Sequence, residues 1–241
     1  MSLELTEDKF LGGRLVAAQP KRGFRAGHDA VLLAAAVPAR AGERALELGS
    51  GSGVASLCLA LRVPGLTVQG IEIERELVDL ANANAARNGM KERVAFAPGN
   101  AEKFEAGQGF HHVFFNPPFH PDTGHASPVA ARDRAMRDVG EAVALWTRSA
   151  LKAIRPGGTL TAILRADRQA EIVDIVGGRG TTVLPLFPRA GEAPKRVIVR
   201  IDKEGDAPLR VAAGLVLHLA DGKPTPEAEG VLRHAGAVSL A

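Results

Sequence analysis

The sequence has too little cysteine for an internal disulfide and no apolar run of membrane-spanning length. Its one cysteine, Cys58, lies in an apolar segment where we expect a core position. A membrane-spanning helix needs about 20 consecutive apolar residues, and no stretch reaches that length. The acidic N-terminus lacks the basic and apolar regions of a signal peptide. We therefore expect a cytoplasmic protein with no membrane partner.

The composition favours a globular chain. Of the 241 residues, 46% are hydrophobic and 24% are charged, which supports a packed core. The net charge of +3 is mildly basic and does not by itself indicate a nucleic-acid partner. We find no internal repeat or low-complexity tract, so we expect one domain covering residues 1–241.

From residue 45 onward, strand-like and helix-like segments alternate, which is the pattern of a doubly wound, mostly parallel α/β sheet. The predicted strands cover residues 44–48, 67–72, 93–97, 111–115, 158–164, 181–187 and 195–202, and the predicted helices cover 53–62, 74–88, 138–154 and 167–176. No long helix separates the last two strands, so we expect an antiparallel strand at that edge.

The two ends of the chain give weaker signals. Residues 1–11 show no clear period, whereas residues 12–20 fit a short hairpin strand that ends at proline. Asp29 is placed to cap a helix over residues 30–37. Near the C-terminus, residues 209–219 fit a strand or two, and Thr225-Pro226 begins a short capped helix.

The most informative stretch is the glycine-rich turn of residues 47–53, which follows a short strand and precedes an apolar helix. Its glycines allow a sharp turn and the close approach of a ligand. A dinucleotide site would place a third glycine where this chain has Val54. The turn therefore favours a ligand without a phosphate at this point. Glu47, just before it, can hold an ammonium group.

Two other strand ends carry candidate site residues. Glu72 ends the second strand, where an acid can accept hydrogen bonds from both hydroxyls of a ribose. The tetrapeptide Asn116-Pro117-Pro118-Phe119 directly follows the apolar run of residues 113–115.

In this order, the glycine turn, Glu72 and the Asn-Pro-Pro-Phe tetrapeptide resemble the S-adenosylmethionine-dependent methyltransferases that act on amino groups of bases. The segment of residues 19–34 resembles, more narrowly, the bacterial tRNA adenine-N6 methyltransferases that modify valine tRNA beside the anticodon. That family often has a small hydroxyl residue where this chain has His28. The resemblance implies S-adenosylmethionine as cofactor, tRNA as substrate class, and a seven-stranded Rossmann-like sheet. It leaves the oligomeric state open.

The resemblance also assigns roles along the chain. Residues 1–40 would close over the methionine end of the cofactor and contact substrate, 41–203 would form the core sheet, and 204–241 would be a C-terminal extension. Asn100 would meet the adenine edge, because its amide both donates and accepts hydrogen bonds. The implied cofactor-binding residues are Phe24, Glu47, Gly49, Gly51, Gly53, Glu72, Ile73, Asn100, Ala101 and Asn116.

The implied catalytic residues are Asn116, Pro117 and Phe119. An exocyclic amine is a poor nucleophile, because its lone pair is conjugated into the ring. The Asn116 side-chain oxygen and the Pro117 carbonyl could accept its two N–H groups and aim the lone pair at the methyl group, while Phe119 stacks on the unstacked base. The implied substrate-binding residues are Lys21, Arg22, Arg25, Pro118 and His120.

Other functions fit parts of the pattern. An rRNA guanine-N2 methyltransferase also uses Asn-Pro-Pro-Phe, but typically carries a duplicated domain for which this chain is too short. A protein glutamine methyltransferase usually has tyrosine in place of Phe119 and an added N-terminal helical domain. A non-catalytic RNA-binding module is the remaining alternative. His111, His112, His120 and His125 lack cysteine or carboxylate neighbours at metal-ligand spacing, so we expect hydrogen-bonding histidines and no metal.

Overall fold

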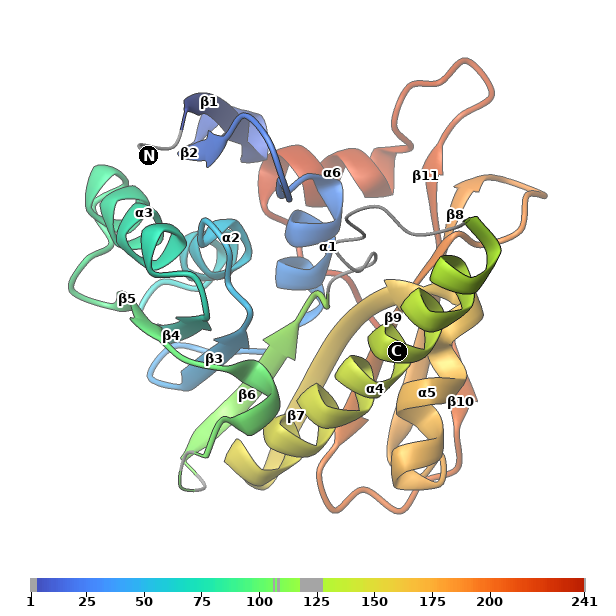
Figure 1. Ribbon diagram of the computed structural model, residues 1–241. Helices are drawn as coiled ribbons and strands as arrows, with labels where there is room; N and C mark the ends of the chain where they lie inside the picture. The colour runs from blue at the N-terminus through green and yellow to red at the C-terminus, as the bar shows by residue number, and fades with distance from the viewer. Residues whose placement is uncertain (1–3, 106, 108, 118–127, 241) are drawn as a thin grey trace.

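A computed structural model of the chain describes residues 4–240 except 106, 108 and 118–127. The strands are β1 (Leu5–Phe10), β2 (Leu15–Pro20), β3 (Arg44–Leu48), β4 (Thr67–Glu72), β5 (Val94–Pro98), β6 (Phe110–Phe115), β7 (Ile154–Arg165), β8 (Thr181–Arg189), β9 (Arg196–Asp202), β10 (Arg210–Val211) and β11 (Leu215–His218). The helices are α1 (His28–Ala36), α2 (Val54–Arg62), α3 (Arg75–Arg87), α4 (Pro128–Ala153), α5 (Gln169–Val173) and α6 (Pro226–His234). Figure 1 shows their arrangement.

A nine-stranded sheet forms the centre of the fold, in the order β10-β8-β9-β7-β6-β3-β4-β5, with β11 also paired to β8. Strands β3 to β7 run parallel to their neighbours within this group, and β9 is antiparallel to both β7 and β8. The predicted α/β fold class is confirmed. The antiparallel strand lies inside the sheet rather than at its edge, because β8, β10 and β11 continue the sheet beyond it.

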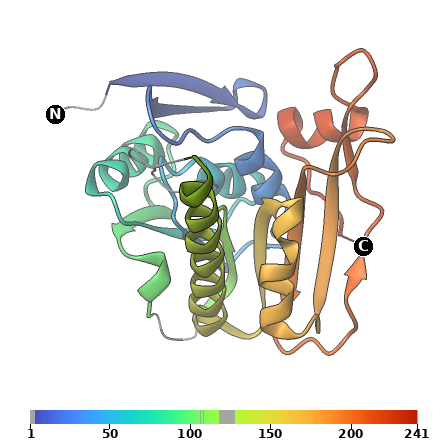
Figure 2. The same cartoon turned by 45° about the vertical axis from the view of Figure 1, so that its right-hand side comes forward.

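Helices cover both faces of this sheet and define two hydrophobic clusters. On one face, α1, α2 and α3 pack on residues such as Ala45, Phe114 and Ile198. On the other face, which is turned toward the viewer in Figure 2, α4 and α5 pack on Phe115 and Leu160. This three-layer arrangement leaves the carboxyl ends of the parallel strands to the loops, where ligands bind in open α/β sheets.

Helix α1 is internal because almost all of it is apolar. Residues 30–36 are all buried, and α6 packs against the helix from outside the sheet. The prediction that Asp29 caps α1 is wrong, since the helix begins at His28 and no side chain caps it. Asp29 lies in the first turn and instead accepts a hydrogen bond from Arg196 of β9, at 2.9 Å.

The other element predictions fall close to the structure, with some differences. Residues 5–10 form β1, an antiparallel partner of β2, where no element was expected. Helix α4 begins at Pro128 rather than at residue 138, and β7 begins at Ile154 rather than at residue 158, so Pro156-Gly157-Gly158 lie within the strand or at its predicted start. The predicted cap of α6 is confirmed: Thr225 Oγ1 accepts a hydrogen bond from the Ala228 amide. Within the described residues, no helix is long and apolar enough to cross a membrane.

Candidate active site

The predicted site residues meet at the carboxyl edge of the sheet because the parallel strands end in register. Leu48, the last residue of β3, lies opposite Ile71 of β4 and Phe115 of β6. The residues that follow, Gly49 and Asn116, therefore leave adjacent strands side by side. The chain runs outward from β3 to β5 and then returns to the other side with β6, so the crevice of the fold opens between β3 and β6.

The glycine turn adopts a backbone that other residues rarely accept. Gly49, Gly51 and Gly53 have φ of 66°, 53° and 82°. A Cβ at Gly49 would lie 2.4 Å from Cη2 of Trp146, and one at Gly53 would lie 2.6 Å from Cζ of Phe96. These two glycines are therefore needed for packing as well as for the turn, whereas a Cβ at Gly51 would meet no atom closer than Phe24 Cδ1, at 3.9 Å.

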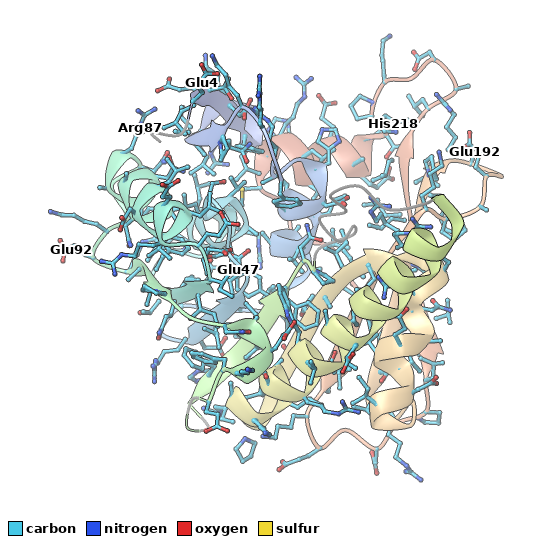
Figure 3. All side chains as sticks on the ribbon, in the orientation of Figure 1. Glu4, Glu47, Arg87, Glu92, Glu192 and His218 are labelled. Atoms are coloured by element: carbon cyan, nitrogen blue, oxygen red, sulfur yellow. The ribbon has the colours of Figure 1, made fainter. Side chains whose placement is uncertain are left out.

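Glu47, labelled in Figure 3, precedes this turn at the end of β3 and is only 3% exposed. Its Oε2 accepts hydrogen bonds from the Ser56 amide at 3.0 Å and from Ser56 Oγ at 2.5 Å. Burial raises the pKa of Glu47 to about 8, although the Ser56 hydrogen bonds oppose the rise. A cationic group bound beside it would favour the carboxylate, so the side chain suits an ammonium ligand.

Glu72 organises the opposite side of the turn. Its Oε2 accepts a hydrogen bond from the Gly51 amide at 2.9 Å, and its Oε1 accepts two, from the Ile73 amide at 2.7 Å and the Glu74 amide at 3.1 Å. Because a carboxylate oxygen has two lone-pair positions, Oε2 can still accept a hydroxyl. Glu72 thus fixes the glycine turn and retains an acceptor for a ribose.

Two exposed apolar side chains flank the turn. Ile73 is 66% exposed and directly follows Glu72, and Phe24 is 59% exposed. The Phe24 ring reaches over Gly51, with Cδ1 3.9 Å from where a Cβ would stand. The Oδ1 of Asn100 accepts a hydrogen bond from the Glu102 amide, which leaves the side-chain NH2 group of Asn100 free to donate to a ligand. Ala101 beside it is buried. These surfaces suit a flat aromatic ring.

Asn116 carries an unsatisfied acceptor at the carboxyl end of β6. Its Oδ1 is buried and has no hydrogen-bond partner within the described part of the chain, and the following Pro117 is buried. Ser50 Oγ in the glycine turn is likewise buried and unpartnered. Buried polar atoms are usually paired, so these two are suited to a ligand. Pro118, Phe119 and His120 lie outside the described residues.

Gln19 is a site residue that sequence reasoning missed. It is buried at the end of β2, where its Oε1 accepts the Ala26 amide at 2.8 Å and Ser52 Oγ at 3.2 Å. Its Nε2 donates to Asp8 Oδ2 at 2.8 Å and to the Ala26 carbonyl at 3.1 Å. One amide thus links the loop that carries Phe24 to the glycine turn. The Gln-Pro sequence alone gives no signal of these distant partners.

The three cations predicted to bind substrate differ in their surroundings. Arg25 donates to Asp8 Oδ2 at 2.5 Å and to Thr6 Oγ1 at 2.6 Å, so it holds the loop to β1. Lys21 is half exposed and lies 3.6 Å from a Glu4 carboxylate oxygen. Arg22 is exposed. The structure therefore gives Arg25 a structural role and leaves Lys21 and Arg22 at the surface.

The histidines of β6 are held by hydrogen bonds. His112 is buried, with its ring nitrogens 2.8 Å from Glu43 Oε2 and 2.9 Å from Thr159 Oγ1. Burial lowers its pKa. The ring of His111 contacts the Arg44 amide and Arg155. Both residues lie at the end of β6 away from Asn116.

Together these features fit S-adenosylmethionine. Glu47 suits its ammonium group, Glu72 its ribose, and the amide donors of Asn100 its adenine. A Cβ at Gly51 would meet no atom closer than the exposed Phe24 ring at 3.9 Å, so the ligand can approach the backbone beneath that ring. Ser50 Oγ, which has no partner among the described residues, offers it a further polar contact.

Comparison with known proteins identifies the family. Residues 26–173 match the model of the methyltransferase small domain. A tRNA1(Val) (adenine(37)-N6)-methyltransferase of Porphyromonas gingivalis is 31% identical over 225 residues, covering 85% of each chain. A release factor glutamine methyltransferase of Gloeobacter violaceus is 30% identical over 158 residues, covering 62% of this chain and only 51% of the relative.

A solved structure of another methyltransferase has a similar fold. The crystal structure of a predicted O-methyltransferase from Agrobacterium tumefaciens superposes with a TM-score of 0.73 at 25% identity, covering 88% of this chain and 98% of that one. The family match extends from the loop after Phe24 through the glycine turn, Glu72 and Asn116. The chain therefore belongs to the methyltransferase small domain family and is an S-adenosylmethionine-dependent methyltransferase.

Proposed function

We propose that this enzyme methylates the exocyclic N6 amino group of an adenine in RNA, with tRNA as its substrate class. The observation that carries the proposal is the buried Oδ1 of Asn116 at the carboxyl end of β6, which has no hydrogen-bond partner among the residues that the structure describes. An acceptor in that state suits a substrate that brings N–H donors. The P. gingivalis tRNA methyltransferase, similar over most of its length, supports tRNA as the substrate class.

The chemistry assigned to the chain is mainly orientation. Asn116 Oδ1 and the Pro117 carbonyl accept the two N–H groups of the amine, which holds the nitrogen lone pair in line with the methyl group. When bound, S-adenosylmethionine would supply that methyl group as an electrophile, with its sulfur as the leaving group. The nitrogen proton becomes acidic once the nitrogen is alkylated, so solvent can remove it without a strong base. Phe119 is proposed to stack on the base.

Single-turnover methylation of unmodified tRNA transcript, at saturating cofactor, tests this function. The product should be N6-methyladenosine when the digested RNA is read by mass spectrometry. Asn116→Ala should slow the reaction roughly a hundredfold, the scale of losing one positioned polar group. Asn116→Asp should retain more activity, because it keeps an acceptor oxygen. Cofactor affinity, measured by calorimetry, should survive both changes, since Glu47, Glu72 and Asn100 remain.

The outcomes separate the rival substrates. An alanine variant that turns over at the wild-type rate would exclude the amine-orienting role of Asn116. N2-methylguanosine as product would keep the mechanism and change the base. The Gloeobacter relative adds a third candidate substrate, a glutamine side chain, because its amide also offers two N–H groups to Asn116. Methylation of a glutamine-containing release factor, with no product on RNA, would select that substrate.

A further inference from the structure

A cavity outside the active site lies where the two ends of the chain meet α1. It has a volume of about 330 Å³ and is bounded by the 3-10 turn η1 (Leu11–Gly13), the start of α1, the segment after β11, and α6. That volume is at the lower end of small-molecule sites, which span roughly 300–1,000 Å³. None of the roles assigned above uses this cavity.

The floor of the cavity is apolar and rigid. Leu11 and Val31 are buried and belong to the main core, and Leu232 packs against it. Leu11 has a left-handed backbone with φ of 53°, an outlier of the kind that persists where the surroundings hold it in place. A Cβ at Gly12 would lie 3.0 Å from the Arg233 carbonyl oxygen, so η1 packs closely on the end of α6. Phe10 and Leu232 line the cavity and are only partly buried, so a flat apolar group can rest on them.

The rim is mostly basic. Lys9 and Arg233 line it together with His28 and His218. Lys9 has no ion pair within the described residues, and Arg233 lies 3.6 Å from Glu229, the one acidic residue that lines the cavity. A basic rim above an apolar floor suits a ligand with a phosphate and a flat ring, which is the chemistry of a nucleotide.

The cavity is also within reach of the active site. His28 follows Phe24 by four residues, and an extended chain spans at most about 3.6 Å per residue, so their Cα atoms are no more than about 14 Å apart. On the other side, His218 Nδ1 lies 3.3 Å from the Pro188 carbonyl oxygen, next to Arg189 of the β8–β9 hairpin. Figure 3 shows His218 beside Glu192 of that hairpin.

We propose that this cavity binds a nucleotide flanking the target adenine, with its base on Phe10 and Leu232 and its phosphate between Lys9 and Arg233. The proposal rests on RNA being the substrate and adds a second contact to it. A target base must leave its stack to enter the active site, so neighbouring nucleotides become available for separate pockets.

Charge reversal at the rim tests the proposal in the whole enzyme. The double variant Lys9→Glu/Arg233→Glu should raise KM for tRNA about tenfold and lower the salt slope of binding by about two, with little change in kcat or cofactor affinity. Arg75→Glu/Lys91→Glu makes the same change in charge at two exposed residues on α3 and beyond it. Its neighbour Glu92 lies across the molecule from His218 in Figure 3, so this control should shift KM much less.

A readout without catalysis separates this inference from the proposed function. A short adenine-containing single-stranded RNA should shift the ring NMR signals of His28 and His218, and the Lys9/Arg233 variant should abolish the shift. If RNA is methylated but the rim variant behaves like the control, the cavity is not a nucleotide site. If RNA is not methylated but the histidine signals shift and the variant abolishes the shift, the site stands without the function.

If the double variant fails to fold, Lys9→Ala and Arg233→Ala should each raise KM about threefold, and an unchanged KM in both would overturn the proposal.

Discussion

Of the two carboxylates in the site, Glu47 is more deeply buried than Glu72. Burial raises its pKa from an ordinary value of 4.5 to about 8. Between these values the folded chain holds a proton that the unfolded chain has lost, so the free energy of unfolding falls as pH rises through this window. Above about pH 8 both states are ionised, and the loss is complete.

We therefore expect the free energy of unfolding of the cofactor-free enzyme to fall between about pH 5.5 and about pH 8.5. This fall should be larger than the fall in its Glu47→Gln variant. The glutamine keeps the shape of the side chain and cannot ionise, so the difference between the two proteins isolates Glu47 from the histidines. Urea unfolding at both pH values measures it. Parallel pH profiles for the two proteins would mean that Glu47 ionises normally.

At the scale of elements, the loop between β2 and α1 depends on one side chain. Gln19 forms hydrogen bonds with the amide and the carbonyl of Ala26 and with the hydroxyl of Ser52. These bonds fix the position of the loop that carries Phe24 over Gly51. Gln19→Met keeps the volume and removes these hydrogen bonds. Leaving such buried partners unpaired costs about 1–3 kcal/mol, which we expect to appear as a looser loop.

The expected result for Gln19→Met is faster hydrogen exchange at the Ala26 amide and cofactor affinity lower by about tenfold, from the same loss of buried hydrogen bonds. Ser52→Ala is the matched control, because it removes only the contact to the glycine turn at 3.2 Å and should change Ala26 exchange much less. Unchanged protection of Ala26 in the methionine variant would show that the loop is held by Arg25 and Asp8 alone.

The strands of the sheet could be predicted from the sequence where both of their faces are buried. Strands such as β4 and β6 end in buried, mostly apolar residues, so their carboxyl ends, and with them Glu72 and Asn116, follow from the sequence. Strand β1 was missed because four of its six residues are polar and none of the six is fully buried; it is held by pairing with β2. Trp146 and Gln19 act across long stretches of chain, and no local pattern indicates which distant residues they contact.

At the scale of the molecule, we propose that residues 1–40, 41–203 and 204–241 form one cooperative domain. Leu15, Leu57 and Val231 come from these three segments and belong to one hydrophobic cluster. Each segment covers apolar surface of another, as α6 covers α1. The second cluster, around Phe115 and Leu160, lies within residues 41–203, but it shares strands with the first: Ala45 and Leu46 of β3 belong to different clusters. We therefore expect the two clusters to unfold together.

Calorimetry should therefore show one unfolding transition whose calorimetric and van't Hoff enthalpies agree. A chain ending at residue 203 should lose that transition or melt far earlier, because α1 would be exposed along the side that α6 covers. Two resolved transitions in the full chain, with the truncated chain retaining the upper one, would make residues 204–241 an independent unit.

The packing of Trp146 on the glycine turn has an optical consequence. The chain has one tryptophan and no tyrosine, so its near-ultraviolet emission comes from this indole. The ring edge lies against Gly49 and stands edge-on to Phe115, with centroids 5.7 Å apart. We expect the emission to change on titration with S-adenosylmethionine, at the affinity that calorimetry gives, without any added label. A flat emission trace alongside a clear calorimetric isotherm would place the ligand away from this turn.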